Sequence, residues 1–235
     1  MEPPLTKTQL DGLVKFDTPT ICNALSALQP DGGRRNVTTG KLYCPFPDRG
    51  AMVGYARTAA VRSARPDLTV DADPMDAWKA YWRYLFDGPM PSVSVVQDLD
   101  GEQAGYGSFW GEINANVHRR LGCVGTLTEG SIRDLDAIPA GFQMLARKAV
   151  PSDGYVRLTE FGCIVRVAGL EVRSGDLIHA DRHGAVIVPA ELAQRLAETA
   201  AKVVKAERVV IDLCNGPGFS LEALGEAWTR MGDLQ

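Results

Sequence analysis

Residues Ser92–Asp134 read SVSVVQDLDGEQAGYGSFWGEINANVHRRLGCVGTLTEGSIRD. The apolar runs at 92–97 and 123–128 have the length of buried strands, and residues 112–121 between them are expected to form a helix. A strand, a helix and a second strand in this order predict a βαβ unit, whose two strands pair in parallel. We therefore place the chain in the α/β class.

Further helices and strands are predicted on both sides of this unit, with glycine and proline marking their boundaries. Leu5–Leu28 predicts two short helices broken at Asp17-Thr18-Pro19, where Thr18 is placed to cap and Pro19 to open the second helix. The remaining predicted elements are strands at 50–61, 143–146, 163–167, 177–180 and 185–188 and helices at 74–85, 190–213 and 220–231. Together they predict one α/β domain over residues 1–235, with a mixed sheet and flanking helices.

The composition narrows the expected partners. The 235 residues are 45% hydrophobic, which is ample for a core. A net charge of −4 and an isoelectric point near 5.4 lack the basic excess that attracts nucleic acid or anionic membrane, so neither is expected as a partner. No run approaches the roughly 18 apolar residues that span a bilayer. The first residues, MEPPLTKTQLDG, do not resemble a secretion signal, so we expect a cytoplasmic protein.

The cysteines do not suggest a reactive or metal-binding centre. Five of them are scattered along the chain without a CxxC pair, which predicts reduced, buried thiols. The three histidines, His118, His179 and His183, are expected to be structural or surface groups, with His118 solvated. No serine elbow motif is present, so hydrolase chemistry has little support.

A glycine-rich loop, Gly105–Gly111, follows the first strand of the βαβ unit and opens its helix. The glycines are spaced GxGxxxG, one residue longer than a dinucleotide fingerprint, and the acidic residues of the approach, Asp98, Asp100 and Glu102, would repel a pyrophosphate. A nicotinamide or S-adenosylmethionine site is therefore not expected. Free amides at a helix N-terminus would still favour a smaller anion such as a carboxylate.

The pair Arg133-Asp134 follows the second strand, after Gly130 permits a tight turn. Ligands of parallel α/β sheets bind at the carboxyl ends of strands, where both loops emerge. Arg133 can hold a carboxylate or a 2-oxo oxygen with two donors, and Asp134 offers the hard oxygen that Mg²⁺ prefers. A solvated Arg–Asp pair that caps the next segment fits the spacing about equally well.

Two motifs resemble the RraA-like family. The first is Glu112 and, after twenty residues, Arg133-Asp134, together with the stretch Gly122-Cys-Val-Gly-Thr-Leu-Thr-Glu-Gly-Ser-Ile-Arg-Asp134. The second is the tail with Gly175-Asp176, Ala180-Asp181, Gly184 and Val188-Pro189. The N-terminal Thr18-Pro19-Thr20-Ile21 also fits, so the resemblance covers nearly the whole chain. The family includes 4-hydroxy-4-methyl-2-oxoglutarate and 4-carboxy-4-hydroxy-2-oxoadipate aldolases, which also decarboxylate oxaloacetate, and inhibitors of ribonuclease E.

The resemblance implies a swivelling β/β/α-type fold, assembled as a homotrimer or homohexamer with active sites between subunits. It implies that Asp134 binds Mg²⁺ or Mn²⁺ and that Arg133 holds the pyruvyl or enolate oxygen. The residues whose amides would bind the substrate carboxylate are Gly107, Ser108, Phe109, Trp110 and Gly111. Two departures are visible: Glu112 stands where the aldolases usually have Asp, and Asn23 replaces a common Asp. A carboxylate supplied by a second subunit maps to Glu207.

The function implied by this resemblance is that of a metal-dependent lyase that cleaves a small 2-oxo acid through a pyruvate enolate. Glu112 or Glu207 would position a water that takes the proton of the substrate hydroxyl. Decarboxylation of a 2-oxo diacid would use the same enolate. The alternative is a regulatory binding protein of the ribonuclease E inhibitor type, although an acidic residue directly after Arg133 favours an enzyme.

Overall fold

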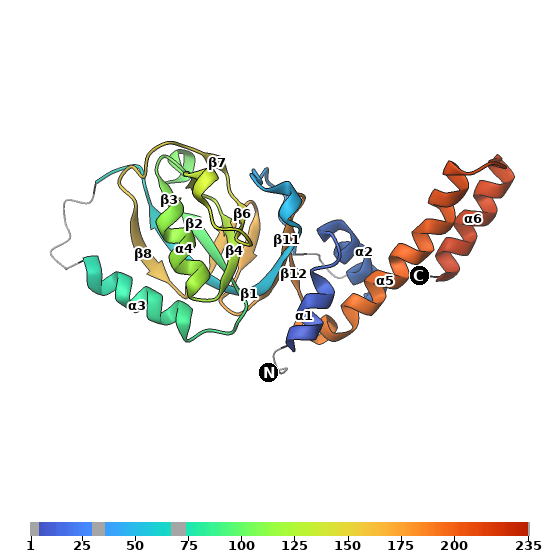
Figure 1. The fold of residues 1–235 in the computed structure, drawn as a ribbon, viewed down its shortest axis with the longest axis horizontal. Helices are drawn as coiled ribbons and strands as arrows, with labels where there is room; N and C mark the ends of the chain where they lie inside the picture. Colours follow the sequence, from blue (N-terminus) through green and yellow to red (C-terminus); the bar gives the residue numbers. More distant parts are fainter. Residues whose placement is uncertain (1–4, 30–35, 67–73, 235) are drawn as a thin grey trace.

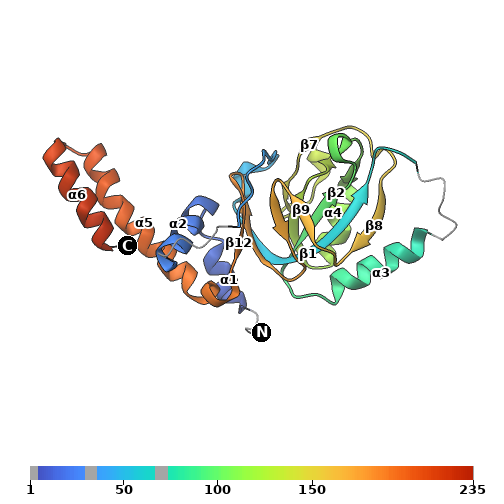
Figure 2. The same cartoon turned by 180° about the vertical axis from the view of Figure 1, so that it is seen from behind.

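The structure is a computed structural model that describes residues 5–29, 36–66 and 74–234. A curled sheet with helices α3 and α4 beside it forms a body at one end of the molecule (Figure 1). At the other end, α5 and α6 form a helical arm that extends away from the body, as the view from behind also shows (Figure 2). None of the described helices is both long and apolar enough to cross a membrane.

The main sheet has seven strands in the order β12-β11-β1-β2-β4-β6, with β8 pairing to the second half of β1. Its parallel strands are β1 (Met52–Arg62), β2 (Ser92–Asp98), β4 (Cys123–Thr128) and β6 (Gln143–Leu145). Its antiparallel strands are β8 (Arg157–Phe161), β11 (Leu177–Asp181) and β12 (Gly184–Val188). The predicted α/β class with a mixed sheet is therefore confirmed, as is the parallel pairing of the βαβ unit.

The helices form two groups, each with its own apolar core against the sheet. Their bounds are α1 (Lys7–Leu13), α2 (Thr18–Leu28), α3 (Pro74–Phe86), α4 (Glu112–Arg120), α5 (Ala190–Asn215) and α6 (Leu221–Leu234). Helices α1, α2 and α5 share one apolar core with β11 and β12, which includes Leu13, Ile21, Val188 and Leu196. Helices α3 and α4 share another core with β2, which includes Tyr81, Val96 and Trp110. The two groups of helices therefore pack at different ends of the sheet (Figure 1).

Two small sheets were not predicted from the sequence, although one of their strands, Val165–Val167, lies within the strand predicted at 163–167. One has the order β3-β5-β7 and consists of Ser108–Trp110, Ser131–Ile132 and Lys148–Ala149; the other pairs β9 (Val165–Val167) with β10 (Leu170–Val172). The four strands that were not predicted have two or three residues each, which is too short to show an alternating pattern. The first of these sheets decides the site, because β3 and β5 pair in parallel and bring Trp110 opposite Ile132.

Two residue predictions are wrong. Thr18 does not cap α2: the N-cap is Asp17, whose Oδ1 accepts a hydrogen bond of 2.9 Å from the amide of Thr20. The Thr18 hydroxyl instead lies 3.0 Å from Nδ1 of the buried His179 and ties α2 to β11. His118 is not solvated but fully buried, because α3 packs over the face of α4 that carries it.

None of the five cysteines forms a disulfide, as predicted, but they are not all buried. Cys123 is buried beside Ser92, and burial raises its pKa to about 11. Cys214, on α5, is exposed. A thiol with a raised pKa holds little thiolate near neutral pH, so Cys123 is a poor nucleophile.

Candidate functional site

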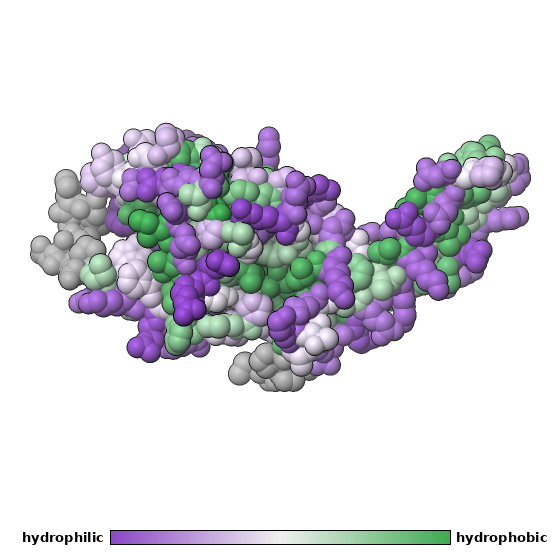
Figure 3. Space-filling view, in the orientation of Figure 1, coloured by the Kyte–Doolittle hydropathy of each residue, from purple (hydrophilic) through white to green (hydrophobic). Residues whose placement is uncertain are grey.

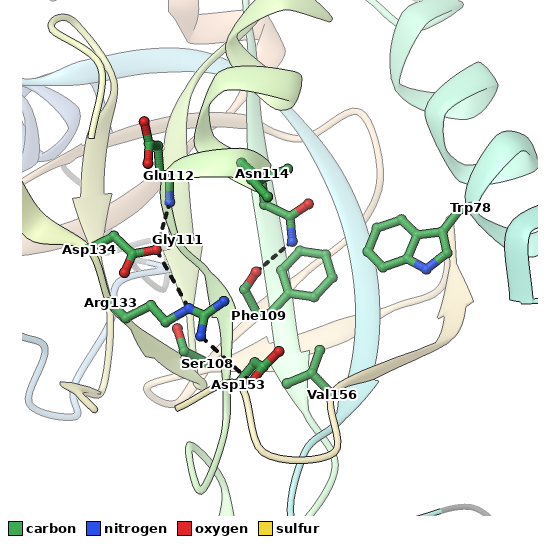
Figure 4. Close-up of a pocket in the computed structure, with 11 residues that line it drawn as sticks. Trp78, Ser108, Phe109, Gly111, Glu112, Asn114, Arg133, Asp134, Asp153 and Val156 are labelled. Atoms are coloured by element: carbon green, nitrogen blue, oxygen red, sulfur yellow. Dashed lines mark hydrogen bonds and ion pairs between the residues drawn. The ribbon is translucent and has the colours of Figure 1, made fainter. Parts of the chain in front are cut away.

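A cavity of about 320 Å³ opens where β3, β5 and the start of α4 meet. It is lined by Trp78, Ser108, Phe109, Gly111, Glu112, Ile113, Asn114, Arg133, Asp134, Asp153 and Val156. Figure 4 shows the charged side chains on one side of Phe109 and Trp78 on the other. The cavity therefore has a polar end and an aromatic end.

The polar end is organised around the carboxylate of Asp134. Its Oδ2 accepts a hydrogen bond of 3.1 Å from the amide of Glu112, the first residue of α4, and lies 3.6 Å from Nε of Arg133. The backbone of Asp134 is left-handed, with φ of 56°, a conformation that costs a residue with a Cβ on the order of 1 kcal/mol. The amide of Arg133 donates to the carbonyl of Trp110 over 2.8 Å, which fixes β5 beside β3. The strained turn thus presents Asp134 to the N-terminus of α4.

Position 111 requires glycine because neighbouring side chains approach its Cα closely, and not because of its backbone torsion angles, which are extended. A Cβ at this position would lie 2.5 Å from Oδ2 of Asp134 and 3.2 Å from Nε of Arg133. Gly107 has a similar role, because its Cβ would lie 2.1 Å from the carbonyl oxygen of Asp153. Two glycines of the loop therefore leave room for the charged residues of the site.

The acidic residues before the loop shape it instead of facing a ligand. Asp98 is 3% exposed, and its Oδ2 accepts hydrogen bonds of 2.7 Å from both the Ser63 hydroxyl and the amide of Gly105. Asp100 accepts hydrogen bonds from the amides of Ser63 and Ala64, and these bonds contribute to lowering the pKa of its carboxyl group against the effect of burial. Both carboxylates are thus part of the scaffold that holds β3.

The start of α4 leaves donors available to an anion. Within the part of the chain that the structure describes, the amides of Ile113 and Asn114 have no hydrogen-bond acceptor, whereas the amide of Glu112 is bound by Asp134. The Asn114 side chain donates 2.6 Å to the carbonyl of Phe109 and holds β3 against the helix. Free amides at the positive end of the helix dipole suit a carboxylate.

Arg133 is the one cationic side chain among the lining residues, and it is shared between two carboxylates. Besides Asp134, its Nη1 lies 3.6 Å from Oδ1 of Asp153 (Figure 4). Its Nε is buried and makes no hydrogen bond with any described residue. With Glu112, the lining includes three carboxylates and one guanidinium, so the cavity carries an excess of negative charge.

This donor set fits a hydrated divalent ion better than a fully protein-coordinated one. Among the described residues, no group of three or more His, Cys, Asp or Glu side chains could hold a metal. Mg²⁺ commonly binds through one or two carboxylates and keeps several waters. Asp134 meets this requirement, because one of its oxygens is positioned by the Glu112 amide and the other has no bond to a described residue.

The aromatic end is built by Trp78 of α3 and Phe109 of β3. Their rings are stacked, with centroids 5.7 Å apart and an angle of 11° between the planes. Val156 and the exposed Ile113 are the other apolar residues that line the cavity. This end of the cavity offers contact area and no charge.

The structure brings together most of the predicted site residues but not all of them. Those that line the cavity are Ser108, Phe109, Gly111, Glu112, Arg133 and Asp134. Gly107 lies behind it, against Asp153. Trp110 is fully buried, with its ring 4.5 Å from that of His118 and 5.7 Å from that of Phe142. Trp110 therefore packs in the core, and only its backbone supports the site.

Glu207 does not line this cavity. It is on α5, where its Oε1 accepts a hydrogen bond of 3.1 Å from Asn23 of α2. Helix α5 packs on the β11 and β12 side of the sheet, away from α4 (Figure 1). Within one chain, Glu207 and Asn23 thus contact each other and not the cavity.

Several lining residues were not predicted: Trp78, Ile113, Asn114, Asp153 and Val156. Trp78 lies in the helix predicted at 74–85, and a pattern of apolar positions does not distinguish a core residue from one beside a cavity. Asp153 follows Ser152 in an ordinary turn sequence, and no local signal marks it. Asn114 and Ile113 could have been found from their place in the first turn of the predicted helix.

Comparison with protein families matches residues 18–187 to the family described as RraA-like (Aldolase/RraA). A relative from Halalkalibacterium halodurans, named a putative 4-hydroxy-4-methyl-2-oxoglutarate aldolase, is 25% identical over 201 residues, which cover 84% of this chain and 86% of the relative. An uncharacterized protein from Methanocaldococcus jannaschii is 27% identical over 118 residues, and the match spans 49% of this chain and 57% of that protein's length.

Solved structures show the same fold. An uncharacterized protein from Pseudomonas syringae pv. tomato has a TM-score of 0.72 at 24% identity, covering 97% of this chain and 96% of that one. RraAS2 from Streptomyces coelicolor, described as an unusual member of the RNase ES inhibitor RraA protein family, has a TM-score of 0.65 at 23% identity, covering 88% and 96%. At these identities the similarity establishes the architecture alone.

Proposed function

Because this chain belongs to the RraA-like family, which covers both aldolases and RraA inhibitors, we propose that it is a divalent-metal-dependent lyase acting on a small 2-oxo acid. The observation that carries this proposal is the carboxylate of Asp134, held by a strained turn at the start of α4 beside Arg133. A structural ion pair would not require a left-handed aspartate facing free helix amides in a cavity. Strained geometry of this kind is characteristic of functional sites.

The bound substrate would be held by three groups of this chain. The amides of Ile113 and Asn114 would receive the substrate carboxylate, and Arg133 would face the 2-oxo oxygen, where negative charge develops when the carbon–carbon bond breaks. Asp134 would hold Mg²⁺ or Mn²⁺. When bound there, the ion would supply Lewis-acid stabilisation of the enolate.

The proton of the substrate hydroxyl needs an acceptor. Glu112 is the exposed carboxylate at the mouth of the cavity and can take this proton directly or through a water. Glu207 of the partner subunit is the second candidate, since within one chain this residue is on the far helix. The decarboxylation of a 2-oxo diacid would use the same residues without needing a base.

The second candidate base requires an assembly, and we propose a homotrimer or homohexamer. The helical arm carries exposed apolar side chains: Phe219, Leu221 and Trp228 are 51%, 76% and 61% exposed. Figure 3 shows apolar residues among the polar ones on this arm. Exposed apolar residues grouped on one projecting element are typical of a subunit contact. Light scattering during size-exclusion chromatography measures the oligomeric state. A monomer would contradict the proposal.

The activity is tested with the Asp134→Ala variant. Wild-type protein with Mn²⁺ should release pyruvate from 4-hydroxy-4-methyl-2-oxoglutarate or oxaloacetate, and EDTA should stop the release. Asp134→Ala should lose at least about a hundredfold in kcat/KM, since positioning at the metal is lost, and should also lose Mn²⁺ binding measured by calorimetry. The matched control is Asp136→Ala, an exposed aspartate two residues away that does not line the cavity.

Two results would overturn the proposal. The first is an Asp134→Ala protein that retains metal-dependent pyruvate release. The second is wild-type protein that releases no pyruvate from any 4-hydroxy-2-oxo acid or oxaloacetate with either metal. In that second case the regulatory binding role of the RraA type becomes the better hypothesis.

A further inference from the structure

The two ends of the cavity differ in chemistry, and the difference bears on the substrate. The metal, the carboxylate and the 2-oxo group would all occupy the polar end, around Asp134, Arg133 and the start of α4. The rest of the substrate, which departs when the carbon–carbon bond breaks, would then lie against Trp78 and Phe109 (Figure 4). The aromatic end therefore contacts the departing fragment.

The charges of the cavity disfavour a second carboxylate on that fragment. Arg133 is the single cation among the lining residues, and it already neighbours Asp134 and Asp153. A second substrate carboxylate would approach Asp153 or Glu112 without an unpaired cation to offset the repulsion. Like charges a few ångströms apart in a partly enclosed site are unfavourable.

The apolar lining favours a flat hydrophobic group instead. Trp78 is half-buried and stacks on Phe109, so part of its ring remains open to the cavity. Ile113 is 78% exposed although it is a large apolar residue, and it borders the same cavity. An aromatic ring packed against the open part of Trp78 would gain stacking and apolar contact together.

The aromatic end is held in place by a buried chain of hydrogen bonds. Nδ1 of His118 lies 2.7 Å from the carbonyl of Asn114, which can only accept, so this nitrogen carries the proton of the neutral ring. Nε2 of His118 therefore accepts from the Tyr81 hydroxyl over 2.9 Å. Tyr81 lies on α3, one turn from Trp78, and is fully buried. This bond joins α3 to α4 and fixes the distance of Trp78 from the polar end.

From these observations we propose that the substrate is a 4-hydroxy-2-oxo acid with an aromatic or other flat apolar group on C4, and that Trp78 determines this specificity. The inference rests on the proposed lyase function. The C3–C4 bond breaks, and its electron pair forms the enolate of pyruvate. The C4 hydroxyl loses its proton to the base and becomes the carbonyl of an aromatic aldehyde or ketone. The same proton, returned to C3, completes pyruvate, so no oxidant or other reactant is needed.

The test compares two substrates that differ at C4. These are 4-hydroxy-2-oxo-4-phenylbutanoate, which would give benzaldehyde, and 4-hydroxy-4-methyl-2-oxoglutarate, which carries a second carboxylate. Pyruvate release should have a kcat/KM at least about tenfold higher for the phenyl substrate. In Trp78→Ala this ratio should fall about tenfold, while Trp78→Phe should keep most of it. The control is Phe86→Ala, an exposed aromatic residue at the end of α3 that does not line the cavity.

A binding measurement separates failure of this inference from failure of the lyase function. Phenylpyruvate and 2-oxoglutarate, titrated by calorimetry in the presence of Mn²⁺, should differ in affinity in the same direction, with the difference lost in Trp78→Ala. The proposal is overturned if the diacid is preferred, or if Trp78→Ala leaves the ratio unchanged. If neither substrate is cleaved but phenylpyruvate binds more tightly and depends on Trp78, the lyase function fails and the aromatic specificity of the cavity stands.

Discussion

The two ends of the cavity are built in different ways. The polar end is made within one βαβ unit, where β3, β5 and α4 place Asp134 beside Arg133 through backbone hydrogen bonds and a glycine that makes room. The aromatic end depends on α3, which precedes that unit and reaches it by packing Tyr81 against His118. The polar end is therefore fixed by contacts within one βαβ unit, whereas the aromatic end is fixed by a helix that packs against this unit from outside.

Gly111→Ala should break the polar end with the largest effect. The new Cβ would lie 2.5 Å from Oδ2 of Asp134, so the carboxylate must move. We expect Mn²⁺-dependent pyruvate release to fall about a hundredfold, as is usual for a displacement of about 1 Å at a reacting group. The matched control is Gly225→Ala on α6, where a Cβ meets nothing within 4 Å. Wild-type activity in Gly111→Ala would contradict the role given to this approach.

The aromatic end should weaken in acid. Burial lowers the pKa of His118 to about 4 from 6.5. Between these values the unfolded chain binds a proton that the folded chain does not, so stability falls as the pH falls from 6.5 to 4, by a total on the order of 3 kcal/mol. Burial lowers the pKa of His179 as well, in the same direction.

Denaturant titrations at several pH values measure this dependence. The slope of the free energy of unfolding against pH should be smaller in His118→Gln. The glutamine side chain does not titrate in this range and can still accept a hydrogen bond from Tyr81. An unchanged slope would show that His118 is not protonated with unfolding.

Tyr81→Phe should loosen the aromatic end with a moderate effect. It removes the donor to Nε2 of His118 and leaves that nitrogen buried without a partner, which costs about 1–3 kcal/mol. The melting temperature should fall, and the preference for the phenyl substrate should fall with it, while Mn²⁺ binding at Asp134 is retained. Tyr106→Phe, at a tyrosine that is 55% exposed, is the control. Equal losses of metal binding and of substrate preference would show that the two ends are not independent.

Asp153→Asn should give the smallest effect, and it tests the charge at the boundary between the polar and aromatic ends. It removes the carboxylate that lies 3.6 Å from Nη1 of Arg133. The Asp153 side chain is 64% exposed, so this ion pair contributes at most about 1 kcal/mol to stability. The kcat/KM for the diacid should rise about threefold relative to that for the phenyl substrate. The control is Asp136→Asn, outside the cavity. A lower relative value for the diacid would contradict the charge argument.

Prediction from sequence succeeded where the signal is local. The strands of the βαβ unit, the start of α4 and the long helix before Asn215 all follow from runs of apolar residues and helix signals. The adjacency of Arg133 and Asp134 is covalent, so their joint presence at the end of a strand required no knowledge of the fold. The burial of Trp110 and His118 was not predicted. The same pattern of apolar and polar positions is compatible with burial or exposure as long as the covering helix is not known.

By itself, the sequence determined the α/β class, the βαβ unit and the pairing of a guanidinium with a carboxylate after its second strand. Only the tertiary structure decided the left-handed backbone of Asp134, its bond to the amide of Glu112, and the placement of Trp78 over Phe109. The physical reason is range. Strand and helix patterns arise from neighbours along the chain, whereas a cavity is formed by contacts between segments whose mutual position depends on the packing of the whole core.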